Sequence, residues 1–244
     1  MKLTNEVWAI IPARSGSKGI KNKNIKIFNK KPLVNHSIIS AKKNNMINKV
    51  VFSSDSKKYL SLTKKLNCEF YHLRSKKNAQ DKSTDFQVFK EIVFYFKKKK
   101  VTLPKFLINF RPTCPLRKNQ SITKAIKLFK KKQNYFSSLK SVSYNSHNSL
   151  KDYIIKNKKL CSINGKTGYD IDQVNIPRGN LKKTYIGNGV IDIYKTKNIF
   201  KGKLLGKKVY PYVTEEIFCD IDNKRDFRFA ETIVKTFRNK LWIS

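Results

Sequence analysis

The chain has few acidic residues, few cysteines and no long apolar run. Its cysteines stand singly, with no Cys-x-x-Cys pair or Cys/His cluster, which argues against a zinc site and a disulfide framework. No apolar run approaches the roughly 18 residues of a membrane span. The first residues lead straight into an expected strand, so no signal peptide is expected. Together these absences predict a cytoplasmic protein without membrane contact.

The shortage of acid leaves a formal net charge of +38, from 54 Lys and Arg against 16 Asp and Glu. Taken alone, such an excess suggests nucleic acid or another anionic partner. However, the excess is nearly all lysine and is spread along the whole chain, whereas base readers and phosphate clamps usually favour arginine. Nucleic-acid binding is therefore not expected as the main function, although the charge would steer an anionic substrate to the protein.

Apolar runs alternate with amphipathic segments and predict one α/β domain over residues 1–244, because 39% hydrophobic residues suffice for a core. Strands are expected at 7–11, 47–52, 69–73, 106–110, 135–143, 185–194 and 209–213, and helices at 33–44, 56–65, 86–97, 121–132 and 224–238. This alternation favours a parallel sheet with right-handed crossovers. Between about 144 and 183 the pattern weakens, which indicates an inserted, hairpin-bearing arm.

A loop rich in glycine, serine and lysine follows the first expected strand. Gly16 and Gly19 let backbone N–H groups approach an anion, and Arg14, Lys18 and Lys23 add positive charge. This combination predicts a polyphosphate-binding loop. Its spacing is that of neither a P-loop nor a G-x-G-x-x-G fingerprint. A solvated basic loop is the alternative, because lysine is so common in this chain.

Asp220 and Asp222 are the sharpest acidic feature of the chain. In an extended segment, side chains two residues apart share one face. Two adjacent carboxylates repel each other unless a cation holds them, and their hard oxygen atoms suit Mg²⁺. The alternative is that Asp222 caps the last expected helix.

Taken together, these segments resemble the acylneuraminate cytidylyltransferases, which are CMP-sialic acid synthetases and their CMP-nonulosonate relatives. The resemblance runs nearly end to end and keeps the order of the family's motifs. The segments that carry it are Ala9–Gly19, Lys23-Asn24, Val51–Asp55, Leu73-Arg74, Ala79–Asp81, Arg111–Arg117, His147–Lys151, Arg178 through Gly189, and Asp220–Asp222.

The resemblance implies a Rossmann-like fold of the nucleotide-diphospho-sugar transferase type, with a mostly parallel central sheet. It implies an enzyme that joins CTP to an acidic nine-carbon sugar with Mg²⁺ and releases pyrophosphate, as in lipopolysaccharide or capsule biosynthesis. It also implies a homodimer made through the arm at 144–183. The residues carried over are, for catalysis, Arg14, Lys18, Asp220 and Asp222; for the nucleotide, Arg14, Ser15, Gly16, Lys18, Lys23, Asn24, Arg74 and Asp81; for the sugar, Arg111, Lys151, Arg178 and Asp192; and for the metal, Asp220 and Asp222.

The chain departs from the family pattern on the sugar side. Arg111 stands where the family has Gln, Ile186-Gly187 where it commonly has Arg-Pro, and Asp192 where it has Tyr. These departures predict a sugar other than plain N-acetylneuraminate, such as a legionaminic- or pseudaminic-type acid. The alternatives are a Kdo cytidylyltransferase, whose glycine loop fits this chain less well, and a catalytically silent or RNA-binding basic protein of the same fold.

Overall fold

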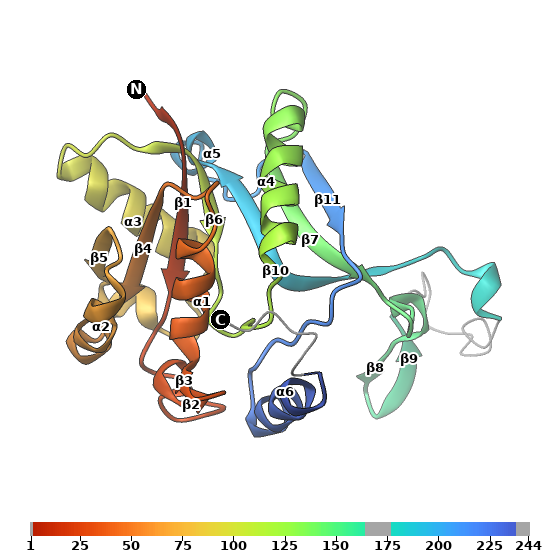
Figure 1. The fold of residues 1–244 in the computed structure, drawn as a ribbon. Coiled ribbons are helices and arrows are strands. Elements are labelled where there is room, and N and C mark those ends of the chain that lie inside the picture. The colour runs from red at the N-terminus through yellow and green to blue at the C-terminus, as the bar shows by residue number, and fades with distance from the viewer. Residues whose placement is uncertain (1, 164–176, 238–244) are drawn as a thin grey trace. The chain divides into compact units, whose positions relative to one another are not determined.

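The structure is a computed structural model that describes residues 2–163 and 177–237 (Figure 1). Contacts divide the chain into two compact units. The first comprises Met1–Ser141, Asn188–Tyr212 and Glu216–Ser244, and the second comprises Val142–Gly187 and Val213–Glu215.

Seven strands form one sheet in the order β11-β7-β10-β6-β1-β4-β5. Their bounds are β1 Thr4–Pro12, β4 Lys49–Ser54, β5 Phe70–Leu73, β6 Pro104–Asn109, β7 Ser138–Tyr144, β10 Tyr185–Lys195 and β11 Val209–Val213. Strands β5, β4, β1 and β6 pair in parallel, and β10 is antiparallel to β6. The predicted α/β fold with its parallel sheet is confirmed. The register sets Ile10 opposite both Val51 and Asn109, so the carboxyl ends of β1, β4 and β6 lie along one edge.

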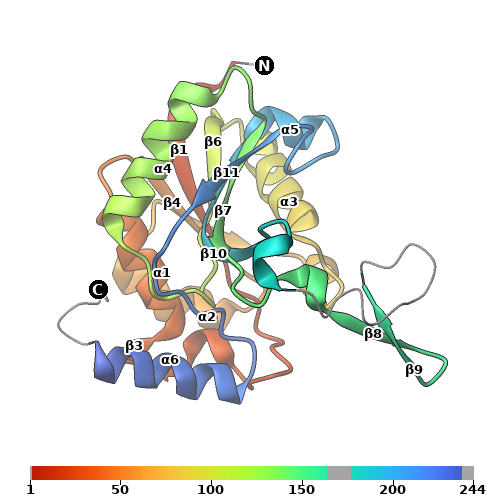
Figure 2. The same ribbon diagram turned by 90° about the vertical axis from the view of Figure 1, so that its right-hand side faces the viewer.

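Helices cover both faces of this sheet, as Figure 2 shows. They are α1 Leu33–Lys42, α2 Lys57–Thr63, α3 Asp85–Lys98, α4 Asn119–Lys132 and α5 Thr196–Phe200. Helix α6 (Lys224–Thr236) packs instead in a separate apolar cluster with Phe28 and Leu33. The alternation along β1 explains the two layers. Val7, Ala9 and Ile11 join the core beneath α1 and α4, whereas Trp8 and Ile10 join the core beneath α3 and α5.

Local sequence accounts for the helix starts that frame the site. A reciprocal capping box begins α3, in which the Thr84 side chain accepts from the Gln87 N–H and the Gln87 side chain accepts from the Thr84 N–H. The same arrangement of Asn223 and Asp226 begins α6. The cap of the last helix is therefore Asn223, and the alternative of Asp222 as that cap is wrong.

The second unit contains a hairpin of β8 (Tyr153–Lys156) and β9 (Lys159–Ser162), paired from Tyr153 opposite Ser162. Its two-residue turn, Asn157 and Lys158, has positive φ at both positions, the geometry that joins twisted strands tightly. This hairpin lies inside the segment predicted as an arm. The role of that arm in dimerisation and sugar binding stays a prediction, and residues 164–176 lie outside the described residues.

The first expected strand begins at Thr4 rather than Val7, and the sequence missed one short α-helix and two short strands. The elements are α5 and the two-residue strands β2 (Ile27–Phe28) and β3 (Lys31–Pro32), which are too short for a periodic pattern. The fifth expected strand begins at Ser138 rather than Tyr135, whose side chain is 76% exposed. Among the described helices, none is both long and apolar enough to cross a membrane.

Candidate functional site

A cavity of about 310 Å³ opens in the first unit beyond the carboxyl ends of β1, β5 and β6. Parallel strands bring their carboxyl ends to one edge, so loops that are far apart in sequence meet there. The loops after these three strands supply most of the wall, together with the start of α3 and the segment before α6. The predicted site residues on the wall are Arg14, Lys18, Lys23, Asn24, Arg74, Asp81, Arg111 and Asp222.

Asp81 bridges two of the cations predicted to hold phosphate. Its Oδ1 accepts a hydrogen bond from Arg14 Nη1 at 2.6 Å, and its Oδ2 lies 2.6 Å from Lys18 Nζ. Hydrogen bonds from Lys18 and then Arg14 lower the pKa of Asp81, so the carboxylate is ionised at neutral pH. One carboxylate therefore binds both cations, one with each of its oxygens. Two oxygens of a phosphate group could bind the same two cations in the same way.

Two predicted nucleotide-binding residues fix the loop instead of facing the cavity. The Ser15 backbone N–H and hydroxyl donate to the two carboxylate oxygens of Asp55 at 2.8 and 2.7 Å. Gly16 is likewise not among the residues that line the cavity. Asn24 does line it, and its amide also donates to the Arg14 carbonyl at 2.8 Å. Asp55 ends a segment that carried the family resemblance, but its role as the anchor of this loop was not predicted.

The acidic segment before α6 is fixed to two other loops of the site. The Ile221 N–H donates to the Thr113 carbonyl at 2.9 Å, and Lys23 Nζ donates to the Ile221 carbonyl at 2.5 Å. Lys23 Nζ also lies 2.8 Å from the Asp222 carboxylate. Lys23 is therefore buried as the counter-ion of the acidic segment, rather than extended toward the centre of the cavity.

Gly19 allows the glycine loop to approach this segment. A Cβ atom at position 19 would lie 2.1 Å from the Asp222 carbonyl oxygen, which excludes any larger residue without a backbone shift. Asp222 lines the cavity with a side chain that is 71% exposed, whereas Asp220 is exposed but is not among the lining residues. Within the described ranges no three His, Cys, Asp or Glu side chains are grouped closely enough to hold a metal ion by themselves.

Arg111 enters the cavity wall held by two carboxylates. Its Nη1 donates to Asp192 at 2.8 Å and its Nη2 to Asp85 at 2.6 Å. Burial acts to lower the pKa of Arg111, but the charges of Asp192 and Asp85 outweigh it and raise the pKa. Asp192 has a fully buried side chain that also faces Lys140 Nζ at 3.5 Å and the Tyr194 hydroxyl at 3.3 Å. The structure thus places Asp192 behind Arg111 and away from the cavity surface. The sequence had predicted that Asp192 contacts the sugar.

Arg74 is the least satisfied polar group on the cavity wall. It is 5% exposed, and its Nε and Nη2 atoms have no hydrogen-bond partner among the described residues. Burial lowers its pKa, with Asp55 and Glu91 opposing the shift, and an arginine still carries its charge at neutral pH. Buried polar groups are normally paired, so these free donors mark a place for the acceptor atoms of a ligand.

The remaining predicted residues lie elsewhere. Lys151 closes the 3-10 helix η4 (Ser149–Lys151) and Arg178 begins η6 (Arg178–Asn180), both in the second unit. Cys114, in the loop after β6, is 1% exposed, and burial raises the pKa of its thiol to about 12. Because only a thiolate is strongly nucleophilic, Cys114 is a packed residue.

The cytidylyltransferase family model matches residues 8–218. The N-acylneuraminate cytidylyltransferase of Escherichia coli O18:K1:H7 is 29% identical over 95% of this chain and 52% of its own length. The CMP-N,N'-diacetyllegionaminic acid synthase of Legionella pneumophila is 32% identical over 51% of this chain and 53% of its own length. The match thus spans about half the length of both curated relatives.

Among solved structures, a CMP:2-keto-3-deoxy-manno-octonic acid synthetase in complex with CTP superimposes with a TM-score of 0.65. It covers 95% of this chain and 99% of its own, at 10% sequence identity. At that identity the likeness shows a shared fold.

Proposed function

Because the chain belongs to the cytidylyltransferase family, we propose that it couples CTP to a nonulosonic, sialic-acid-like acid to give a CMP-sugar and pyrophosphate. The names of the two curated relatives support this reaction class. The observation that carries the proposal is the convergence of Arg14, Lys18 and Arg74 on one cavity beyond the carboxyl ends of parallel strands. Three cations from two distant loops suit a substrate with several phosphate groups.

In the proposed reaction, the anomeric hydroxyl of the sugar attacks the α-phosphorus of CTP. An oxygen–phosphorus bond forms, the bond from the α-phosphorus to the β-phosphate oxygen breaks, pyrophosphate leaves, and the hydroxyl proton passes to water. No protein nucleophile is required, so the chain acts by positioning and by stabilising charge. Arg14 and Lys18 would exchange the Asp81 carboxylate for phosphate oxygens and take up the charge that develops on the leaving group.

The two free donors of Arg74 would orient the nucleotide. A guanidinium with two unpaired N–H groups can donate a forked pair of hydrogen bonds to one ligand oxygen or to two neighbouring ones. Because the backbone of Arg74 is fixed by a 2.9 Å hydrogen bond to Ser54, these donors are held in place before the ligand arrives. Pre-organisation of this kind reduces the entropy that binding must overcome.

Asp220 and Asp222 fit a magnesium ion by the chemistry of their donor set. Both carboxylates are exposed, Asp222 lies on the cavity wall, and the buried Ile221 between them is pinned to the Thr113 loop. Mg²⁺ is usually held by one or two carboxylates, and its other ligands are water and substrate phosphates. When bound, the ion would supply positive charge that offsets the charge of the triphosphate.

The sugar acid is the least constrained part of the proposal. Arg111 reaches the cavity, but both of its Nη atoms are engaged by carboxylates, so it presents a fixed and largely neutralised wall. The departure of Arg111 and Asp192 from the family pattern supports a sugar other than plain N-acetylneuraminate, such as a legionaminic- or pseudaminic-type acid. Lys151 and Arg178 of the second unit are proposed to contact the sugar in a homodimer, in line with the family resemblance.

The test is pyrophosphate release from CTP and Mg²⁺ with a panel of nonulosonic acids and Kdo. We expect release with CTP alone among the nucleoside triphosphates, and with a diamino nonulosonate in preference to N-acetylneuraminate. The variant Arg74→Met, whose side chain can fill the same buried space without its donors, should raise the KM for CTP. Absence of both turnover and CTP binding in the folded protein would refute the proposal, and turnover with Kdo alone would correct the sugar.

A further inference from the structure

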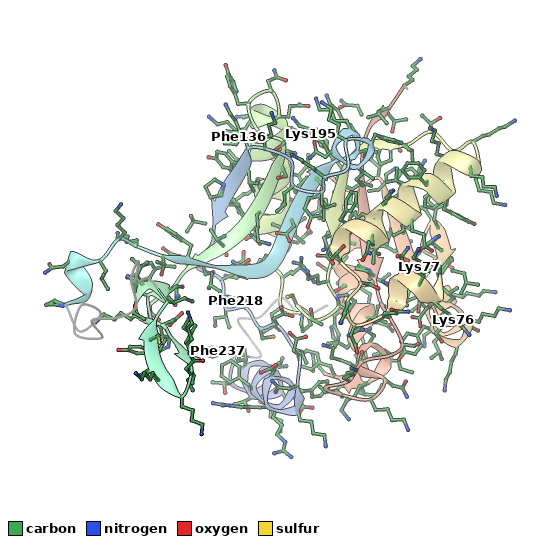
Figure 3. The ribbon with its side chains drawn as sticks, turned by 180° about the vertical axis from the view of Figure 1, so that it is seen from behind. Lys76, Lys77, Phe136, Lys195, Phe218 and Phe237 are labelled. Atoms are coloured by element: carbon green, nitrogen blue, oxygen red, sulfur yellow. The ribbon has the colours of Figure 1, made fainter. Side chains whose placement is uncertain are left out.

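A second cavity, of about 490 Å³, lies in the first unit at the other end of the central strands, away from the first cavity. Lys195, on its wall, ends β10 and pairs with Phe106 near the start of β6, whereas the first cavity lies beyond the end of β6. In Figure 3 Lys195 and Phe136, which also lines this cavity, are labelled side by side at that end of the sheet. The proposed reaction makes no use of this cavity.

Lysine dominates the wall of the second cavity. Six of its twelve lining residues are lysines, although lysine is only 46 of the 244 residues in the chain. No aspartate or glutamate is among the lining residues that the structure describes. The lysines are Lys195, Lys197, Lys201, Lys203, Lys207 and Lys208. A concave surface lined by charges of one sign concentrates ions of the opposite sign.

Lys195 is the buried cation on the wall of the second cavity. The residue is 6% exposed, and its Nζ donates to the Gln133 carbonyl without any ion pair to a carboxylate among the described residues. Burial, with Lys197 and Lys105 nearby, lowers its pKa. A buried ammonium group without a counter-ion is unfavourable, and a bound anion would relieve it.

The lysine-bearing loop after α5 is fixed before any ligand binds. The Asn198 amide donates to the carbonyls of Ser137 and Leu204 at 2.9 and 3.1 Å. The Ser137 N–H donates to the Lys208 carbonyl at 2.7 Å. Gly206 has a φ of +78°, and a Cβ there would lie 2.6 Å from Ser137 Cβ, so glycine is required for this close approach. The cavity is therefore a built feature of the fold.

We propose that the second cavity binds a small polyphosphate anion. Lysine ammonium groups act as point charges that suit phosphate oxygens without demanding one planar geometry. Six of them around one cavity exceed what a single phosphate group would neutralise, which favours a ligand with two or more phosphates. This site is separate from the first cavity, and the proposal holds whether or not the chain transfers cytidylyl groups.

The test is calorimetric titration with inorganic tripolyphosphate in the absence of divalent cations. Arg14→Gln/Lys18→Gln/Arg74→Met serves as the background, because it removes the three cations proposed to hold phosphate in the first cavity. In that background, Lys201→Gln/Lys203→Gln/Lys207→Gln should weaken binding about tenfold or more. The matched control is Lys57→Gln/Lys58→Gln/Lys64→Gln, which removes three exposed lysines at and just after α2 and should change affinity less than about twofold.

Equal losses in the two triple variants would overturn the proposal, because binding would then follow net charge. So would an unchanged affinity in the Lys201 triple variant, or binding of a single-stranded RNA oligonucleotide through these lysines without any binding of tripolyphosphate. Lys195→Met provides a second, independent variant. It removes a buried charge without removing bulk, so it should weaken tripolyphosphate binding while leaving the thermal midpoint unchanged or higher.

Discussion

The pair of Arg111 and Asp192 offers the most quantitative test of the site's architecture. Arg111→Gln would leave the fully buried Asp192 carboxylate facing only Lys140, at 3.5 Å, and a tyrosine hydroxyl. Breaking a buried ion pair in this way costs about 3 kcal/mol. Asp192→Asn should cost less, about 2 kcal/mol, because Arg111 is 25% exposed and keeps Asp85 at 2.6 Å.

The double variant Arg111→Gln/Asp192→Asn removes both charges and leaves neither one unpaired. We therefore expect it to cost less than the two single changes together, with a coupling free energy of about 2 kcal/mol. Urea unfolding followed by the fluorescence of Trp8, which is buried in the core of the first unit, measures this difference. The control cycle is Lys42→Gln with Glu69→Gln, an exposed pair at 3.4 Å whose coupling should not exceed about 0.5 kcal/mol.

Additive effects at Arg111 and Asp192, within the error of the control cycle, would refute the assignment of Asp192 as the counter-ion that positions Arg111. The KM values of the Asp192→Asn variant separate an effect on the position of Arg111 from an effect on stability. If Asp192 holds Arg111 against the sugar acid, Asp192→Asn should raise the KM for the sugar while leaving the KM for CTP nearly unchanged. Equal changes in the KM for the sugar and the KM for CTP would mean that Asp192 acts only through the stability of the fold.

Three further predictions concern charge. Burial, opposed by Glu91, lowers the pKa of His72 from 6.5 to about 4, so the folded state binds fewer protons in that window. Stability should fall by about 3 kcal/mol as the pH drops from 6.5 to 4, and His72→Gln should flatten this part of a urea-unfolding profile. Asp81→Asn frees two cations and should tighten pyrophosphate binding about threefold by calorimetry; weaker binding would contradict the bridge. Asp220→Asn and Asp222→Asn should each cut Mg²⁺-dependent turnover about a hundredfold, and near-normal rates would remove the metal assignment. The thermal midpoint should stay unchanged in Asp220→Asn but fall in Asp222→Asn, because the buried Lys23 loses its counter-ion.

The parts of the fold that follow from local pattern were predictable from the sequence. The alternation of apolar residues along β1 places each side chain on one of two faces, and the capping box of Thr84 and Gln87 is a four-residue signature. The glycine loop and the Asp220–Asp222 segment were likewise visible as residue types at fixed spacing. Helix α5, with five residues, was not predictable, because it is too short to show a helical period.

Only the tertiary structure decided which charged and polar side chains pair with each other in the site. Asp192 meets Arg111 because β10 runs antiparallel to β6 with Asp192 opposite Asn109, a register that no local pattern encodes. Ser15 meets Asp55 because the parallel strands β1 and β4 end at one edge. Lys23 meets Asp222 because the segment before α6 is held against the loop after β6, where the Ile221 N–H donates to the Thr113 carbonyl. Residue type and spacing determined which chemistry this chain carries. Strand order and register decided which charges pair with each other and which, like those of Arg74, are left for a ligand, because an ion pair depends on distances of a few ångströms that only the packed chain defines.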